Sequence, residues 1–148
     1  MKNLDVERGL LAAFLSRPEL LDDFIEKIHI DLFTDKVHRD IYKLIEEMYQ
    51  DKGKITRTQI LVFLREKGHE DYMDLISGSG YILPDEAEDL IELLNNCYNQ
   101  RVLRAGLNRA YEFIEDTNLT VEERNSRVQD VIFELTNGFR SGKLIYNA

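Results

Sequence analysis

The chain has 148 residues, of which 43% are hydrophobic and 32% are charged, so collagen-like, low-complexity and disordered chains are excluded. Its 19 Lys and Arg against 28 Asp and Glu give a net charge of −9, which argues against a domain that coats nucleic acid nonspecifically. Cys97 is the only cysteine, so neither an intrachain disulfide nor a cysteine-based zinc site can form. The short apolar run 10–15 suits neither a signal peptide nor a membrane span, and we expect a cytoplasmic protein.

Apolar residues at helical spacing predict helices through the first half of the chain. Two segments, Ser16–Glu19 and Thr56–Gln59, are expected to form capping boxes that begin helices. His38 is expected to pack or form a hydrogen bond at a helix start rather than to bind a metal. Five helices are predicted in this half. The first begins after Asn3, the second runs from Pro18 to Ile28, and the third runs from Asp35 to Gly53. The fourth runs from Thr56 to Gly68 and the fifth from Asp71 to Ile76.

The second half of the chain has a different pattern. Residues 77–80, Ser-Gly-Ser-Gly, are the one evidently flexible stretch and predict an internal boundary. No proline interrupts residues 85–116, which predicts a helical rod of about 48 Å at 1.5 Å per residue. Asn118 and Thr120 are expected to turn the chain, and Thr120–Glu123 to cap a last helix, so the two helices form a hairpin.

The predicted hairpin carries more apolar surface than its own residues can cover. A partner surface is the natural inference, and the alternative is that the hairpin folds back on the first half and buries this surface internally. Acidic residues crowd positions 85–92, whereas residues 93–111 contain no acid and three arginines, Arg101, Arg104 and Arg109. These arginines could face a phosphate backbone or pair with the acidic band of another copy, and the net charge favours the second reading.

Catalytic chemistry is not visible in the sequence. The segment Gly138–Leu144 has three residues between its glycines and a leucine after the lysine, so it lacks the spacing of a phosphate-binding loop. The three histidines, His29, His38 and His69, are too scattered for a local metal motif, and Cys97 is expected to pack as a small apolar residue. We expect no catalytic, cofactor or metal site within these residues.

The order of the segments resembles the N-terminal domain of the bacterial and phage replicative DNA helicases of the DnaB type. The resemblance covers about 135 of the 148 residues. It departs at Tyr81–Asp85, where the family has P-S-A-A-N, and it lacks the family's motor domain. It is carried by Asn3–Leu15, similar to N-x-E-A-E-x-x-L-L-G-A-x-L; by Pro18–Leu21; by Asp31–Phe33 and His38–Tyr42, similar to D-F-x-x-x-x-H-x-x-I-[FY]; by Tyr72–Leu75; by Arg101–Arg104; and by Ile132–Glu134, similar to I-F-E.

The resemblance implies an all-α fold in which residues 1–80 form a globular head, 81–140 a dimerisation hairpin, and 141–148 the start of a linker to an absent ATPase domain. It implies the collar of a hexameric helicase, a trimer of dimers that docks primase or a loader, admits DNA and performs no hydrolysis itself. ATP and Mg would belong to the motor. The resemblance places hairpin packing and subunit contacts on six residues: Leu90, Leu94, Val102, Leu107, Val128 and Ile132. It also places Arg101 and Arg104 near a subunit or DNA surface.

Two explanations remain for the absent motor domain. The chain is a piece of a longer helicase, or it is a naturally isolated relative. In the second case the function would be that of a free-standing helical adaptor or a helicase-loading or regulatory protein. The mass of the native gene product distinguishes the two.

Overall fold

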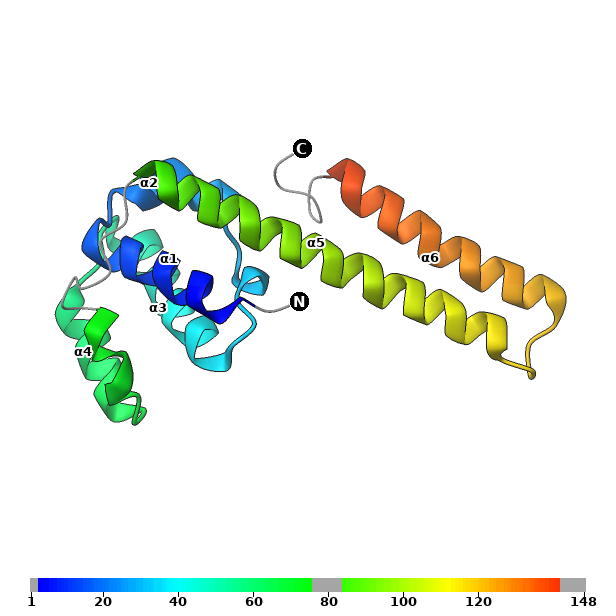
Figure 1. The fold of residues 1–148 in the computed structure, drawn as a ribbon, viewed down its shortest axis with the longest axis horizontal. Coiled ribbons are helices and arrows are strands. Elements are labelled where there is room, and N and C mark those ends of the chain that lie inside the picture. The colour runs from blue at the N-terminus through cyan, green and yellow to red at the C-terminus, as the bar shows by residue number, and fades with distance from the viewer. Residues whose placement is uncertain (1–2, 76–83, 142–148) are drawn as a thin grey trace. The chain divides into compact units, whose positions relative to one another are not determined.

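The computed structural model describes residues 3–75 and 84–141 (Figure 1). The flexible stretch predicted at 77–80 and the linker residues predicted at 142–148 lie outside the described residues. Helices make up all the regular structure of the described ranges, so the predicted all-α class is confirmed. Internal contacts divide the chain into two compact units, a head that ends at Leu94 and a hairpin that begins at Asn95.

The six α-helices and three 3₁₀ helices of the described residues follow one another in chain order. The α-helices are α1 (Leu4–Ser16), α2 (Leu20–Phe24), α3 (Lys36–Lys52), α4 (Arg57–Glu66), α5 (Pro84–Glu115) and α6 (Val121–Ser141). The 3₁₀ helices are η1 (Ile25–Lys27), η2 (Ile30–Leu32) and η3 (Glu70–Leu75), all in the head. The boundary between the two units falls inside α5, so the first turns of that helix belong to the head.

Several predicted helix ends are confirmed by their capping geometry. The Asn3 side chain accepts a hydrogen bond from the Val6 N–H at the start of α1. Asp35 accepts from two backbone N–H groups in the first turn of α3. Gly53 and Gly68 follow α3 and α4 with φ of 65° and 75°, the left-handed conformation that glycine adopts without strain.

Three predictions about local structure are wrong. Ser16 is the last residue of α1 rather than a cap, because the helix takes it in and the Arg17 N–H donates to the Ala13 carbonyl oxygen. The helix predicted from Pro18 to Ile28 divides into α2 and η1, and Ile28 is extended and buried. Thr56 is the residue before α4, but its side chain makes no capping bond. By contrast, the short helix expected at 71–76 is found as the 3₁₀ helix η3, which begins at Glu70, and Ile76 lies outside the described residues.

The core of the head forms around α1, whose residues from Leu10 to Leu15 are all buried. Phe33 and Tyr42 stack with ring centroids 5.0 Å apart, and burial raises the pKa of the Tyr42 hydroxyl above its usual value. The fully buried large side chains of the head come from α1, α2, η2, α3 and α4: Leu10, Leu11, Phe14, Leu15, Leu21, Leu32, Phe33, Ile41, Tyr42, Ile45, Ile60 and Leu64. Burial of this apolar surface is the main stabilisation of the head.

Glu7 is fully buried in the head, and its carboxylate accepts four hydrogen bonds. Oε1 accepts from the backbone N–H groups of Thr34 and Asp35, at 2.9 and 3.4 Å, and from His38 Nδ1 at 3.1 Å. Oε2 accepts from the Thr34 hydroxyl at 2.7 Å. This network ties α1 to the start of α3, and it confirms the prediction that His38 forms a hydrogen bond at a helix end.

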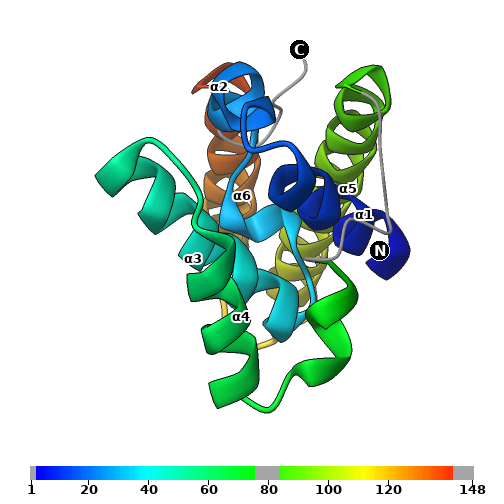
Figure 2. The same ribbon diagram turned by 90° about the vertical axis from the view of Figure 1, so that its left-hand side faces the viewer.

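The hairpin unit consists of the second part of α5 packed antiparallel to α6 (Figures 1 and 2). Ala110 on α5 and Val131 on α6 are buried between the helices. The Leu135 side chain of α6 lies over Gly106 of α5, where an added Cβ atom would lie 2.8 Å from Leu135 Cδ1. The predicted hairpin is therefore confirmed, and glycine at position 106 leaves room for the Leu135 side chain.

Polar contacts close the end of the hairpin where α5 turns into α6. The Glu123 N–H donates to the Thr120 hydroxyl and the Thr120 N–H donates to the Glu123 carboxylate, which confirms the predicted capping box. The Arg124 guanidinium donates to the carbonyl oxygens of Asp116 and Leu119 at 3.3 and 3.1 Å. These bonds satisfy carbonyl groups that follow α5.

Candidate functional site

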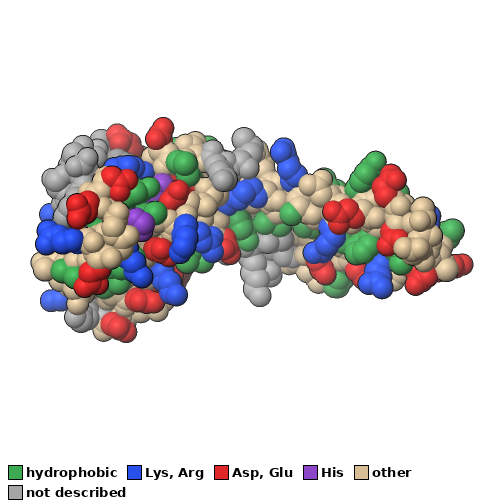
Figure 3. Space-filling model, turned by 90° about the horizontal axis from the view of Figure 1, so that it is seen from below, with side chains coloured by type: hydrophobic (Ala, Val, Ile, Leu, Met, Phe, Trp, Pro, Cys, Tyr) green, Lys and Arg blue, Asp and Glu red, His purple; other side chains and the backbone are tan. Residues whose placement is uncertain are grey.

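Large apolar side chains are exposed along α5 in the hairpin unit. Leu103, Leu107, Tyr111 and Ile114, here called the apolar stripe, are 37%, 62%, 62% and 53% exposed. Their spacing of four, four and three residues places them along one side of the helix. On α6, Ile132 and Phe133 are also exposed, and Figure 3 shows hydrophobic side chains on the hairpin surface among charged ones.

The apolar stripe lies beside the face of α5 that packs on α6. At about 100° per residue, Gly106 and Ala110 centre the packed face, and Leu107 and Tyr111 follow each of them by one position. The small residues Gly106 and Ala110 therefore contact α6, and the large side chains of the apolar stripe lie beside this contact and remain exposed. The arrangement provides an apolar surface that a second molecule can cover.

The six residues predicted at a subunit interface differ in their exposure. Leu107 and Ile132 are 62% and 54% exposed and available for contact. Leu90, Val102 and Val128 are half-buried, and Leu94 is buried in the head unit. Tyr111 and Ile114 belong to the same side of α5 as Leu107 and were missed, although their positions four and seven residues after Leu107 indicated it.

The three arginines of α5 lie in different surroundings. The Arg101 guanidinium carbon is 5.7 Å from the centroid of the Tyr98 ring. Arg109 forms an ion pair with Glu134 of α6 and is thereby held within the hairpin. Arg104 is exposed.

The structure brings two of the three histidines to one aromatic ring. The His38 and His69 rings lie edge-on to Tyr72, with centroids 5.5 and 6.4 Å from its centroid. The guanidinium carbon of Arg8 lies 4.7 Å from the same centroid, and burial raises the pKa of the Tyr72 hydroxyl. Tyr72 thus packs against Arg8 of α1 and His38 at the start of α3. The sequence did not indicate this cluster, because its members lie far apart along the chain.

Metal-binding and membrane-spanning features were sought over the described ranges. Residues 3–75 and 84–141 contain no group of three or more His, Cys, Asp or Glu side chains arranged to hold a metal ion. No helix in these ranges is both long and apolar enough to cross a bilayer. Gly138–Ser141 continue α6, and the rest of the glycine-lysine segment lies outside the described residues.

Residues 1–100 match the family described as DnaB-like helicase N terminal domain. The chain belongs to this family. The match includes the head and the first half of α5, and it confirms the resemblance expected from the ordered motifs. This DnaB-like domain is 27% identical over 150 aligned residues to the probable replicative DNA helicase of Trieres chinensis. The alignment covers 94% of the chain and 32% of the relative, so the chain spans about a third of that protein. No solved structure gives a significant match.

Proposed function

We propose that this DnaB-like domain is the collar of a hexameric replicative DNA helicase, in which hairpins pair between subunits to form a trimer of dimers. The collar docks primase or a helicase loader in the cytoplasm and carries out no catalysis. ATP hydrolysis with Mg and the unwinding of DNA belong to a motor domain of the same protein. Family membership and the helicase relative support this assignment.

The observation that carries the proposal is the apolar stripe on α5. Leu107 and Tyr111 each leave more than half of their surface exposed, although smaller residues on the same helix are buried against α6. Pairing two copies about a twofold axis would cover both stripes with one self-complementary contact. Residues of this kind, large and apolar or aromatic, are those that form the centre of protein interfaces.

Self-association of the chain tests the hairpin part of the proposal. We expect a concentration-dependent dimer in sedimentation equilibrium, and a monomer when Leu107→Ser and Tyr111→Ser are combined. Val121→Ser, at an exposed apolar residue outside the stripe, is the matched control and should leave the dimer unchanged. Circular dichroism should show equal helical content in all three chains. A wild-type monomer at the highest soluble concentration would contradict hairpin pairing.

The native gene product tests the helicase part. A product far heavier than 17.4 kDa in intact-protein mass spectrometry is expected, because the motor would follow the collar in the same chain. A product of 17.4 kDa would instead support the free-standing adaptor or loader.

A further inference from the structure

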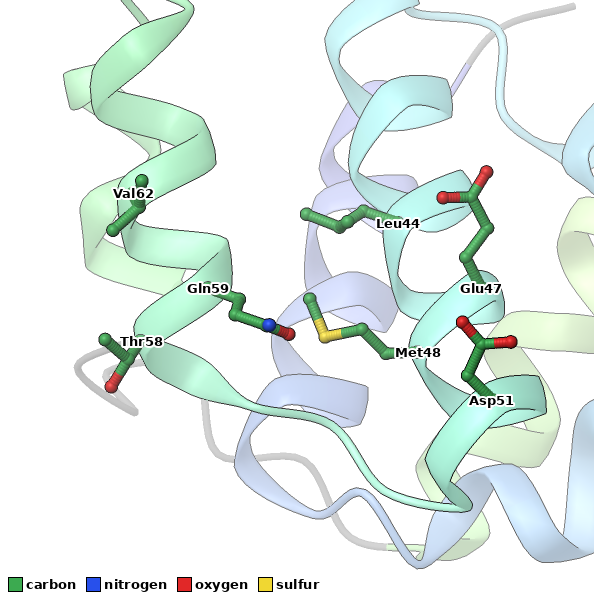
Figure 4. Close-up of a pocket in the computed structure, with 7 residues that line it drawn as sticks. All are labelled: Leu44, Glu47, Met48, Asp51, Thr58, Gln59 and Val62. Atoms are coloured by element: carbon green, nitrogen blue, oxygen red, sulfur yellow. The ribbon is translucent and has the colours of Figure 1, made fainter.

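A groove runs between α3 and α4 in the head, far along the sequence from the hairpin. One cavity of about 450 Å³ is lined by Leu44 and Met48 of α3 and by Gln59 and Val62 of α4. In Figure 4, Leu44 and Met48 point from α3 toward α4, and Gln59 points back toward α3. Val62 is 45% exposed at the edge of this cavity, so its floor and one wall present apolar surface to solvent.

A second cavity, of about 310 Å³, continues the groove. Leu44 and Glu47 line both cavities, and the second one extends to Lys36 on α3, to Phe63 on α4 and to Lys67, which follows α4. The end of α3 faces the start of α4 in the first cavity, and the start of α3 faces the end of α4 in the second. The groove therefore follows both helices, for about 22 Å along α3 at 1.5 Å per residue.

The first cavity carries acidic charge only, whereas lysines outnumber acidic residues in the second cavity. Glu47 and Asp51 lie one turn apart beside the first cavity, and none of its described lining residues is a Lys or Arg. Lys36, Lys43 and Lys67 line the second cavity, together with Asp40, which pairs with Lys36 at 3.4 Å, and with Glu47, which lies where the two cavities meet. Among the described residues, no ion pair uses Glu47, Asp51, Lys43 or Lys67.

The groove is held in shape by the connection between its helices. Gly53 ends α3 in the left-handed conformation, with its N–H donating to the Tyr49 carbonyl oxygen at 2.8 Å. The Thr56 N–H donates to Met48 Sδ at 3.5 Å, which fixes the methionine in the floor. Ile60 and Leu64 of α4 are fully buried on the other side of the helix. A fixed groove lowers the entropic cost of binding.

We propose that this groove binds an amphipathic helix of a partner protein, with an apolar stripe on the floor, acidic residues in its first turns and Lys or Arg in its last turns. The acidic first turns would face Lys43 and Lys67, and the basic last turns would face Glu47 and Asp51. This order of charges also suits the dipole of the partner helix, so the helix runs parallel to α3. The groove lies within the head, and the proposal does not depend on hairpin pairing.

A designed peptide tests the binding chemistry. The probe is a labelled helix of about 16 residues, roughly four turns, with leucines on one side, Glu in the first two turns and Lys in the last two. Fluorescence anisotropy with the full chain should give saturable binding. The combined variant Glu47→Lys and Asp51→Lys should weaken it about tenfold, since two exposed charge contacts are lost and reversed. Asp23→Lys with Glu26→Lys makes the same charge change at exposed positions outside the groove and should leave binding unchanged.

Two further experiments test the direction in which the peptide binds and whether it binds in the groove. A nitroxide at the C-terminus of the peptide should broaden amide resonances near Asp51 and Thr58, and broadening confined to residues 36–40 would overturn the charge register. Val62→Glu should abolish binding, and its circular dichroism and melting temperature should match the wild type because Val62 is partly exposed. Absence of saturable binding, or equal affinity in the groove and control variants, would overturn the proposal. So would a groove variant that changes self-association, because a second copy would then be the occupant.

Discussion

Glu7 stabilises the head through polar contacts rather than through apolar burial. Replacing it with leucine leaves two backbone N–H groups, the Thr34 hydroxyl and His38 Nδ1 without their common acceptor. We expect Glu7→Leu to lower the free energy of unfolding by about 3–5 kcal/mol, as in other broken buried pairs.

Glu7→Gln is the matched control for this prediction. Its amide oxygen can still accept from the backbone, and the Thr34 hydroxyl can turn to accept from the amide, so we expect a loss of about 1 kcal/mol. Urea denaturation followed by circular dichroism measures both variants. Equal losses in the two chains would show that the hydrogen-bond acceptor is unimportant.

Glu123 gives the start of α6 a pH dependence. The hydrogen bond from the Thr120 N–H, followed by the interaction with the Thr120 side chain, lowers the pKa of the Glu123 carboxyl below its ordinary value of 4.5. The unfolded chain therefore binds this proton more readily, so the stabilisation is present above pH 4.5 and is lost as pH falls through the lower folded value. Carbon-detected NMR titration of the Glu123 carboxyl should show the lowered midpoint, and Thr120→Ala should return it toward 4.5. An ordinary midpoint near 4.5 in the wild-type chain would contradict the capping assignment, because the Thr120 N–H bond to the carboxylate would then be absent.

The capping residues predicted at Asn3 and Thr120 are confirmed, and α3 begins after Asp35 as expected. The capping prediction failed at Ser16, where α1 continued through the residue. Glu7 lies in the first turn of α1, and nothing in the local sequence indicated that its side chain is buried. A carboxylate becomes buried only when donors from distant residues converge on it, and spacing within one helix does not contain that information.

The close contact between α5 and α6 depends on Gly106. We expect Gly106→Val to destabilise the hairpin by about 1–3 kcal/mol, because the added atoms meet Leu135 at less than normal contact distance. Combining it with Leu135→Ala should recover part of the loss, so the two effects should not be additive. Ala105→Val, on an exposed position of the same helix, is the control for helix propensity. Additive losses in a thermal denaturation series would exclude direct packing between these residues.

Helices α5 and α6 were predictable because no proline interrupts residues 85–116 and a capped turn at 118–123 separates the two helices. The division of the predicted second helix into α2 and η1 was not, since Leu20, Leu21, Phe24 and Ile28 fit helical spacing and are buried in either conformation. The exposed apolar residues of α5 that could pair between two copies were also only partly predicted. Periodicity identifies apolar sides of α5, but only the position of α6 decides which side is covered.

Arg104 tests how charge contributes when copies of the chain assemble. Under the proposed pairing, the arginine segment of one copy lies beside the acidic residues 85–92 of another copy, so Arg104→Glu should weaken self-association and leave helical content unchanged. Arg104→Gln should have a smaller effect, because it removes charge without introducing repulsion. Light scattering at low and high salt measures both. An unaltered dimer mass for Arg104→Glu would assign the association to apolar contacts alone.

The reactivity of the Cys97 thiol can report how often the surrounding part of α5 opens to solvent. This single thiol is 8% exposed and lies three positions after Leu94, where the head unit ends. A disulfide reagent can reach the sulfur only when this part of α5 becomes accessible, so its reaction rate measures how often that happens. Fraying at the distant turn between α5 and α6 would leave the rate unchanged. The opening of α5 near Cys97 can therefore be measured in the native chain without an added label, and separately from fraying at the turn between α5 and α6.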